Sequence, residues 1–157
     1  MSNIKSVLFV CTGNSCRSVM AEALLKKYLK DSGKDNIKVT SAGVATMPGM
    51  PPTKETLDAL IKEGVETPGS GSRLINADII RDADLILVME NMHKEHILNL
   101  VPEAAGKTYL LREFKKPDAS RDEEGQGIPD PIGRPTEFYR YVLKLIKKEI
   151  ERIAKLL

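Results

Sequence analysis

Residues 5–18 read Lys-Ser-Val-Leu-Phe-Val-Cys-Thr-Gly-Asn-Ser-Cys-Arg-Ser and join three kinds of segment. The apolar run from Lys5 to Val10 predicts a short buried strand. The polar, glycine-containing segment from Cys11 to Cys16 predicts a loop. Apolar residues at helical spacing then predict a helix from about Arg17 to Asp31. A strand, a tight loop and a helix in this order form the first part of a βαβ unit.

The same alternation continues along the rest of the chain. Further strands are expected over residues 37–40, 84–89 and 107–111. Further helices are expected over residues 51–63, 76–82, 91–100 and 136–157, with Asn91 and Thr136 as N-caps of the last two. A polar loop is expected over residues 112–135. Strands alternating with helices favour a parallel sheet. The sequence therefore predicts an α/β fold, a single-domain three-layer sandwich over residues 1–157 with a central four-stranded parallel sheet flanked by helices.

Length and charge narrow the class of protein. The chain has 157 residues, of which 41% are hydrophobic, and its formal net charge is +2. This length suits one domain with one hydrophobic core. The near-balanced charge, without a basic stripe and interleaved aromatics, argues against nucleic-acid binding. The first apolar run, Val7 to Val10, is too short for a signal peptide or a membrane span, so we expect a cytoplasmic protein with no membrane partner.

The few cysteines and histidines argue against a disulfide-stapled fold and against a metal site. Cys11 and Cys16 are the two cysteines, and they lie five residues apart. Two cysteines this close cannot staple a domain, and a metal site normally needs more ligands than these. We therefore expect a reducing compartment, no metal and no other cofactor. The two histidines, His93 and His96, lie one turn apart on a predicted helix, where we expect a solvated face rather than a metal pair.

The loop that follows the first strand is typical of an anion-binding nest. A loop wrapped over a helix N-terminus turns successive main-chain N–H groups inward, toward a negative charge. Gly13 lets the backbone bend where a side chain would clash, and Asn14 tolerates left-handed geometry. The predicted phosphate-binding residues are Thr12, Gly13, Asn14, Ser15, Cys16 and Arg17.

Cys11 and Arg17 add a nucleophile and a clamp to this nest. Arg17 offers a planar fork that suits two phosphate oxygens at once. Thiols beside helix N-termini and cations ionise readily, so we expect Cys11 to attack a bound phosphate as a thiolate. No Gly-Lys-Ser/Thr follows the glycine, which excludes a nucleotide-binding P-loop.

With these motifs, nearly the whole chain resembles the low-molecular-weight protein tyrosine phosphatases of bacterial type, including their protein-arginine-phosphatase branch. The loop and the Arg-Ser-x-Met-Ala-Glu beginning at Arg17 carry the resemblance, with Ser41-Ala42-Gly43, Ala83-Asp84-Leu85-Ile86 and Asp130-Pro131. The family implies a four-stranded parallel sheet, a cysteinyl-phosphate intermediate and no metal. It also implies a phosphorylated protein or peptide as substrate and inorganic phosphate as product.

Asp130 is the predicted general acid. It lies in Ile128-Pro129-Asp130-Pro131-Ile132-Gly133, where two prolines fix the backbone on either side of the carboxylate. An isolated Asp-Pro usually marks a turn, but here the family motif assigns Asp130 to proton transfer. It would protonate the leaving group and then act as base on the water that hydrolyses phosphocysteine. Because this loop follows the last predicted strand, it can reach the rim that carries the Cys11 loop.

Three positions depart from the family pattern. Ser15 stands where tyrosine-specific relatives carry a bulky aliphatic residue, arginine-specific relatives Thr, and thioredoxin-linked arsenate reductases Ser. Ile132 replaces an aromatic residue at the pocket mouth. Where relatives carry a histidine that supports the loop, the nearest residue is Ser70. Ser15 and Ile132 are therefore the candidate specificity residues, and loop support is expected from Asn14, Ser18 and Ser41.

Cys16 is a candidate redox partner of Cys11. The two cysteines flank one tight loop, so their sulfurs can approach if the geometry allows a bridge. In relatives with both cysteines, the resemblance implies that the second thiol traps an oxidised first thiol as a disulfide before irreversible damage. The alternative is that Cys16 simply packs under the loop.

Together these features predict a phosphoprotein phosphatase that hydrolyses phosphotyrosine. A protein-arginine phosphatase is the first alternative, because Ser15 is closer to Thr than to Ile in size and polarity. Arsenate reduction is the second. Reductases of this fold relay a disulfide through later cysteines, and none follows Cys16, so an external thiol would be required. A non-catalytic anion-binding module is disfavoured, because nucleophile, arginine and acid are all present.

Overall fold

The computed structural model describes residues 3–116 and 127–157. Within these residues, strands alternate with helices along most of the chain. The strands are β1 Ser6–Cys11, β2 Lys38–Gly43, β3 Leu85–Val88 and β4 Thr108–Leu110. The helices are α1 Arg17–Asp31, α2 Lys54–Lys62, α3 Ala77–Asp82, α4 Asn91–Leu100, the 3-10 helix η1 Pro102–Lys107 and α5 Thr136–Ala154.

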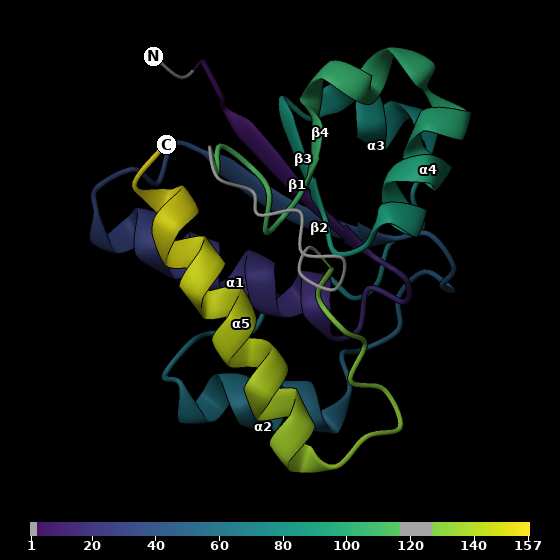
Figure 1. Cartoon of the computed structure of the whole chain (residues 1–157). Helices are drawn as coiled ribbons and strands as arrows, with labels where there is room; N and C mark the ends of the chain where they lie inside the picture. Colours follow the sequence, from purple (N-terminus) through teal and green to yellow (C-terminus); the bar gives the residue numbers. More distant parts are fainter. Residues whose placement is uncertain (1–2, 117–126) are drawn as a thin grey trace.

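The strands form one parallel sheet in the order β2-β1-β3-β4. Helices α1, α2 and α5 lie on one side of the sheet, and α3 and α4 lie on the other (Figure 1). The predicted three-layer α/β sandwich with a four-stranded parallel sheet is therefore confirmed. Strand β2 lies on one side of β1 in the sheet, and β3, the next strand along the chain, lies on the other side of β1. The crevice at such a switch point, beyond the carboxyl end of β1, is where sheets of this kind bind ligands.

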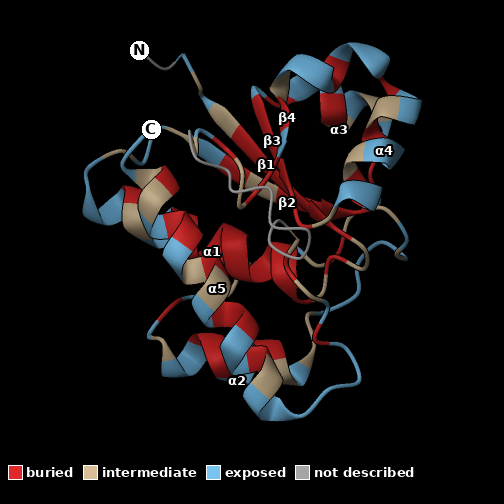
Figure 2. Ribbon diagram, in the orientation of Figure 1, coloured by how far each residue is buried: buried red, intermediate tan, exposed pale blue. Residues whose placement is uncertain are grey.

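Burial of the sheet on both faces explains why its strands are almost continuously apolar. In β1, Val7 and Phe9 belong to the core shared with α1 and α5, whereas Leu8 and Val10 belong to the core shared with α3 and α4. Successive side chains of a strand point to opposite faces, which produces this division. Figure 2 shows the buried strands between the inward faces of the helices. The central strand is therefore a rigid base for whatever follows Cys11.

Several element ends differ from the predictions. Helix α1 has the predicted bounds, whereas β2 extends through Gly43. The predicted N-caps are wrong, because Asn91 and Thr136 are the first helical residues and the caps are Glu90 and Pro135. The 3-10 helix η1, which begins at a proline, was not predicted. Of the predicted loop over residues 112–135, positions 117–126 lie outside the described residues. None of the described helices has the length and hydrophobicity that a bilayer span requires.

Candidate active site

The loop predicted to bind an anion joins the central strand to the N-terminus of α1. We call residues 11–17 the anion loop; Cys11 ends β1 and Arg17 begins α1. Cys16 is the N-cap of α1, but no side chain bonds to the first N–H groups of the helix. The main-chain N–H groups of residues 13–15 donate to no other described residue. Asn14 has a φ of 51°, as its side-chain type allows. These N–H groups are available to a bound anion.

Gly43, at the end of β2, is the glycine that the anion loop requires. A Cβ on Gly43 would lie 2.6 Å from the carbonyl oxygen of Thr12 and 2.9 Å from the main-chain nitrogen of Asn14. Because both neighbours are backbone atoms, any side chain at this position would displace the loop. At Gly13, a Cβ would lie 3.3 Å from Ser15 Oγ, a tight contact that a small shift of the Ser15 side chain would have to relieve.

Asn14 holds the anion loop through three hydrogen bonds. Its side-chain Oδ1 accepts a hydrogen bond of 2.9 Å from the main-chain N–H of Arg73. This contact fixes the orientation of the amide, since only the oxygen can accept. Its Nδ2 therefore donates, at 2.7 Å to Ser18 Oγ and at 2.9 Å to Ser41 Oγ. The structure thus brings together the three residues expected to support the loop.

The orientation of Asn14 leaves the hydroxyl proton of Ser18 available to Cys11. Ser18 Oγ lies 3.0 Å from Cys11 Sγ. Because Ser18 Oγ already accepts a hydrogen bond from Asn14, its own proton is free to point at the sulfur. A hydroxyl that donates to sulfur favours the charged thiolate over the thiol. The predicted nucleophile therefore has a buried hydroxyl within hydrogen-bond distance.

A buried carboxylate, which the sequence analysis did not single out, ends this network. Glu22 Oε1 accepts a hydrogen bond of 2.5 Å from Ser41 Oγ, and Glu22 Oε2 accepts one of 2.6 Å from Lys26 Nζ. Ser41 thus donates to Glu22 while it accepts from Asn14. Ser70, the residue nearest to the missing histidine, is exposed and belongs to no part of the network. The main-chain N–H of Arg73 contacts Asn14 instead.

Arg17 is buried, and its guanidinium is oriented by residues from two other loops. Nη1 donates to Glu90 Oε1 and, at 2.7 Å, to the carbonyl oxygen of Ile128. Nη2 lies 3.6 Å from Asp130 Oδ2 and 3.4 Å from Thr12 Oγ1. A buried cation requires such partners. Because Nη1 already has two acceptors, the N–H groups of Nε and Nη2 are the donors available to a bound anion.

Asp130 lies at the exposed side of Arg17. Its side chain is 41% exposed, so a substrate or water can reach it. Its Oδ1 accepts a hydrogen bond of 3.1 Å from the main-chain N–H of Ile132, which holds the carboxylate in a turn. Ile132 itself is 53% exposed. The predicted acid and one predicted specificity residue therefore both face solvent beside the anion loop.

Cys16 lies beneath the anion loop, against the start of α2. Both cysteines are free thiols and both are buried. Cys16 Sγ lies 3.5 Å from Thr53 Oγ1 and 3.7 Å from Ser15 Oγ. The main-chain N–H of Thr53 also donates to the carbonyl oxygen of Ser15 at 3.1 Å. The N-terminus of α2 is therefore attached to the part of the loop that carries Cys16.

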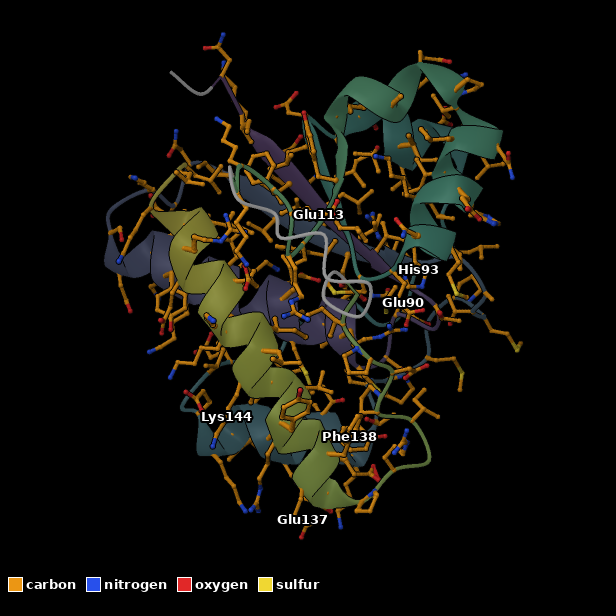
Figure 3. The ribbon with its side chains drawn as sticks, in the orientation of Figure 1. Glu90, His93, Glu113, Glu137, Phe138 and Lys144 are labelled. Atoms are coloured by element: carbon orange, nitrogen blue, oxygen red, sulfur yellow. The ribbon has the colours of Figure 1, made fainter. Side chains whose placement is uncertain are left out.

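The expectation of a solvated histidine pair is wrong for His93. This side chain is buried, and its burial, together with the nearby Arg17 cation, lowers the pKa to about 4. His93 Nδ1 accepts a hydrogen bond of 3.0 Å from the Glu90 N–H, and Nε2 lies 2.9 Å from Thr12 Oγ1. Both ring nitrogens have partners, whereas His96 is exposed. Figure 3 shows Glu90 and His93 together at the start of α4.

Glu90 and His93 would be expected at the site only if the strand order were known. They follow β3, and β3 pairs directly with β1. Residues just beyond the carboxyl ends of adjacent parallel strands lie close together, so polar side chains there contact the anion loop. Sequence alone indicates that β3 exists but not which strand it pairs with. The sequence alone therefore could not place Glu90 and His93 beside the anion loop.

Comparison with known proteins decides the family. The family model described as low molecular weight phosphotyrosine protein phosphatase matches residues 6–157. The chain belongs to the low-molecular-weight protein tyrosine phosphatases. It is accordingly an enzyme of a hydrolase family. One domain spanning residues 1–157 stays a prediction.

Relatives of two named activities resemble the chain to a similar degree. It is 34% identical to the low molecular weight protein-tyrosine-phosphatase Etp of Escherichia coli K12, over 96% of this chain and 93% of that protein. It is 35% identical to a protein-arginine-phosphatase of Geobacillus stearothermophilus, over 95% and 93%. The crystal structure of the low molecular weight protein tyrosine phosphatase of T. tengcongensis superposes with a TM-score of 0.86, at 33% identity and over 97% and 99% of the two chains.

Proposed function

We propose that this enzyme hydrolyses phosphotyrosine in proteins or peptides through a covalent cysteinyl-phosphate intermediate. The observation that carries the proposal is the arrangement around the anion loop. Cys11 lies at its start with the Ser18 hydroxyl within hydrogen-bond distance of the sulfur, and free N–H groups line its middle. Arg17 closes the loop within 3.6 Å of the Asp130 carboxylate. A nucleophile, an anion site and an acid are thus held by the same crevice.

The proposed reaction has two steps. In the first, the Cys11 thiolate attacks phosphorus, the bond from phosphorus to the phenol oxygen breaks, and Asp130 gives its proton to that oxygen. In the second, water attacks the phosphocysteine, Asp130 takes a proton from the water, and the sulfur–phosphorus bond breaks. Inorganic phosphate leaves and the thiolate is restored. Arg17 and the loop N–H groups bind the phosphoryl oxygens in both steps.

A protein-arginine phosphatase is the second candidate, and two observations favour it. Ser15 places a small hydroxyl in the anion loop, and the exposed residue after Asp130-Pro131 is aliphatic Ile132 rather than aromatic. A phosphotyrosine ring gains from flat apolar walls, whereas a guanidinium prefers hydroxyls and carboxylates nearby. The arginine phosphatase of Geobacillus stearothermophilus is as similar to the chain as the tyrosine phosphatase Etp. We therefore expect activity on both substrates in vitro.

The second cysteine gives the proposed enzyme a means of redox protection. Peroxide would oxidise the Cys11 thiolate to a sulfenic acid, and the Cys16 thiol would condense with it to a disulfide and release water. The shared loop, seven residues from Cys11 to Arg17, supports this assignment. Two cysteines five residues apart cannot staple the domain, which suits a reducing compartment, and we assign the enzyme to the cytoplasm on that ground.

The test of the function is side-by-side turnover of matched phosphotyrosine and phosphoarginine peptides. Hydrolysis of phosphotyrosine supports the first candidate, and a strong preference for phosphoarginine would replace it with the second. Ser15→Ile should raise the tyrosine-to-arginine activity ratio, because added bulk and lost polarity penalise the guanidinium more than the ring. Ser70→Ile, the same change at an exposed position, serves as the control. An unchanged ratio in Ser15→Ile would show that Ser15 does not set specificity.

A further inference from the structure

The hydroxyl of Thr12 has two hydrogen-bond donors directed at it. His93 Nε2 lies 2.9 Å from Thr12 Oγ1, and Arg17 Nη2 donates to the same oxygen at 3.4 Å. Arginine is always a donor, so its role in this contact is fixed. The role of His93 depends on which ring nitrogen carries the proton.

The other ring nitrogen of His93 fixes that tautomer. Nδ1 faces the main-chain N–H of Glu90 at 3.0 Å and must accept, because an N–H group can only donate. A neutral histidine with an acceptor Nδ1 carries its proton on Nε2. Burial and the Arg17 cation keep the ring neutral by lowering its pKa to about 4. His93 therefore donates to Thr12.

Because Thr12 Oγ1 accepts both of these hydrogen bonds, its own O–H group must donate to another acceptor. A hydroxyl oxygen has two acceptor positions, and His93 and Arg17 fill both. The Thr12 O–H must then donate, yet it donates to no residue of the described chain, 3–116 and 127–157. The Thr12 side chain is partly exposed at the edge of the anion loop. A donor without a protein acceptor is therefore held in the crevice.

We infer that the Thr12 hydroxyl is a side-chain donor to the bound phosphoryl group and that His93 is the residue that positions it. The inference rests on the proposed function, because that function puts a phosphoryl group in the anion loop. Arg17 Nη2 lies beside both Thr12 Oγ1 and Asp130 Oδ2, so the hydroxyl stands next to the atom that grips phosphate oxygens. The loop thus binds the anion with a preset hydroxyl as well as with main-chain N–H groups.

The first test removes the hydroxyl and keeps the shape. Thr12→Val should lower kcat/KM for p-nitrophenyl phosphate by about 10- to 100-fold, the usual effect of losing a hydrogen bond to a charged group. It should weaken inhibition by inorganic phosphate or vanadate in parallel, since the same contact is lost. Thr12→Ser restores the hydroxyl and should recover most of the loss. Unchanged kcat/KM in Thr12→Val would overturn the inference.

The second test asks whether His93 acts through Thr12. His93→Phe removes the donor and keeps a ring, so it should weaken phosphate inhibition in the Thr12 background but add little to Thr12→Val. Such non-additivity distinguishes a positioning role from a general effect on stability. His96→Phe is the matched control, because His96 lies one turn along the same helix and is exposed. It should change neither kcat/KM nor the inhibition constant for phosphate. Fully additive losses would overturn the role of His93.

Failure of the inference can be told apart from failure of the proposed function. If the wild-type enzyme released no phosphate from p-nitrophenyl phosphate, the function itself would be wrong. If the wild-type enzyme were active and Cys11→Ser inactive, but Thr12→Val matched the wild type, the function would stand and the inference would fall.

Discussion

Ser18 Oγ lies 3.0 Å from Cys11 Sγ and also accepts a hydrogen bond from Asn14 Nδ2, so its own proton is available to the sulfur. The main-chain N–H of Arg73 fixes the amide of Asn14 in the orientation that lets Nδ2 donate to Ser18. Ser41 relays the other amide hydrogen bond to the buried carboxylate of Glu22. Cys11, the proposed nucleophile, is therefore supported by an oriented network that extends into α1 and β2.

Removing the hydroxyl that faces Cys11 should slow the reaction of the thiolate. We expect Ser18→Ala to lower kcat for p-nitrophenyl phosphate by about 10- to 100-fold, because a hydrogen bond to a charged group is lost. The rate of alkylation by iodoacetate at pH 7 should fall as well. Ser70→Ala is the control, since Ser70 is exposed. Equal alkylation rates in Ser18→Ala and the wild type would show that the hydroxyl does not stabilise the thiolate.

Asp130→Asn tests proton transfer to the leaving group. A basic leaving group needs a proton in the transition state, and an acidic one does not. Turnover should therefore fall by about 10²- to 10⁴-fold for phenyl phosphate but much less for p-nitrophenyl phosphate. The measurement is a series of aryl phosphates whose phenols differ in pKa. A uniform loss across the series would mean that Asp130 acts only in the structure, through its contacts with Arg17 and Ile132.

The redox role of Cys16 predicts reversible inactivation. Brief treatment with hydrogen peroxide should abolish activity, and dithiothreitol should restore it, because a disulfide is reducible and a sulfinic acid is not. In Cys16→Ser no disulfide can form, so recovery should fall with exposure time. Activity before oxidation provides the control for each variant. Equal recovery in Cys16→Ser would assign Cys16 to packing against Thr53 alone.

His93 should make folding stability depend on pH. Its pKa is lowered to about 4 by burial and by Arg17, and the Asp130 charge opposes this only in part. The unfolded chain therefore binds more protons between pH 6.5 and pH 4, so the free energy of unfolding falls as pH decreases through that range. The loss is on the order of 3 kcal/mol.

Urea titrations from pH 4 to pH 7.5 would measure this dependence. His93→Gln cannot titrate, so its stability should change less over the interval than that of the wild type. The wild type is compared with His93→Gln because Glu90, Asp130 and His96 lie near His93. These three residues are present in both proteins, so the difference between the two curves reports on His93. Parallel curves for the two proteins would contradict the account of His93.

The parts of the site that lie within a few residues of each other were predictable from sequence. The order of strand, glycine-containing loop and helix located Cys11 and Arg17, since local patterns report local structure. Asp130 was found through its proline-flanked motif and the family resemblance. These assignments need no knowledge of which strands pair.

The residues that the sequence analysis missed depend on tertiary contacts. Glu22 ends the motif that begins at Arg17, but the sequence analysis assigned it no role because a charged residue on a helix is normally solvated. Only the packing of α1 on β2 buries it against Ser41. His93 was assigned to a solvated face because its spacing from His96 says nothing about β3 pairing with β1. Gly43 was missed because its role depends on β2 running beside the anion loop. A side chain on Gly43 would collide with the backbone of Thr12 there.

The covalent intermediate is the central claim, and trapping it is the most direct test. The measurement is mass spectrometry of the peptide that contains Cys11, after rapid acid quenching of the Asp130→Asn enzyme with p-nitrophenyl phosphate. Without the base, hydrolysis of phosphocysteine should slow and the adduct should accumulate. The account predicts one added phosphoryl group on Cys11, absent from Cys11→Ala. Steady release of nitrophenol with no phosphoryl group on Cys11 would contradict it.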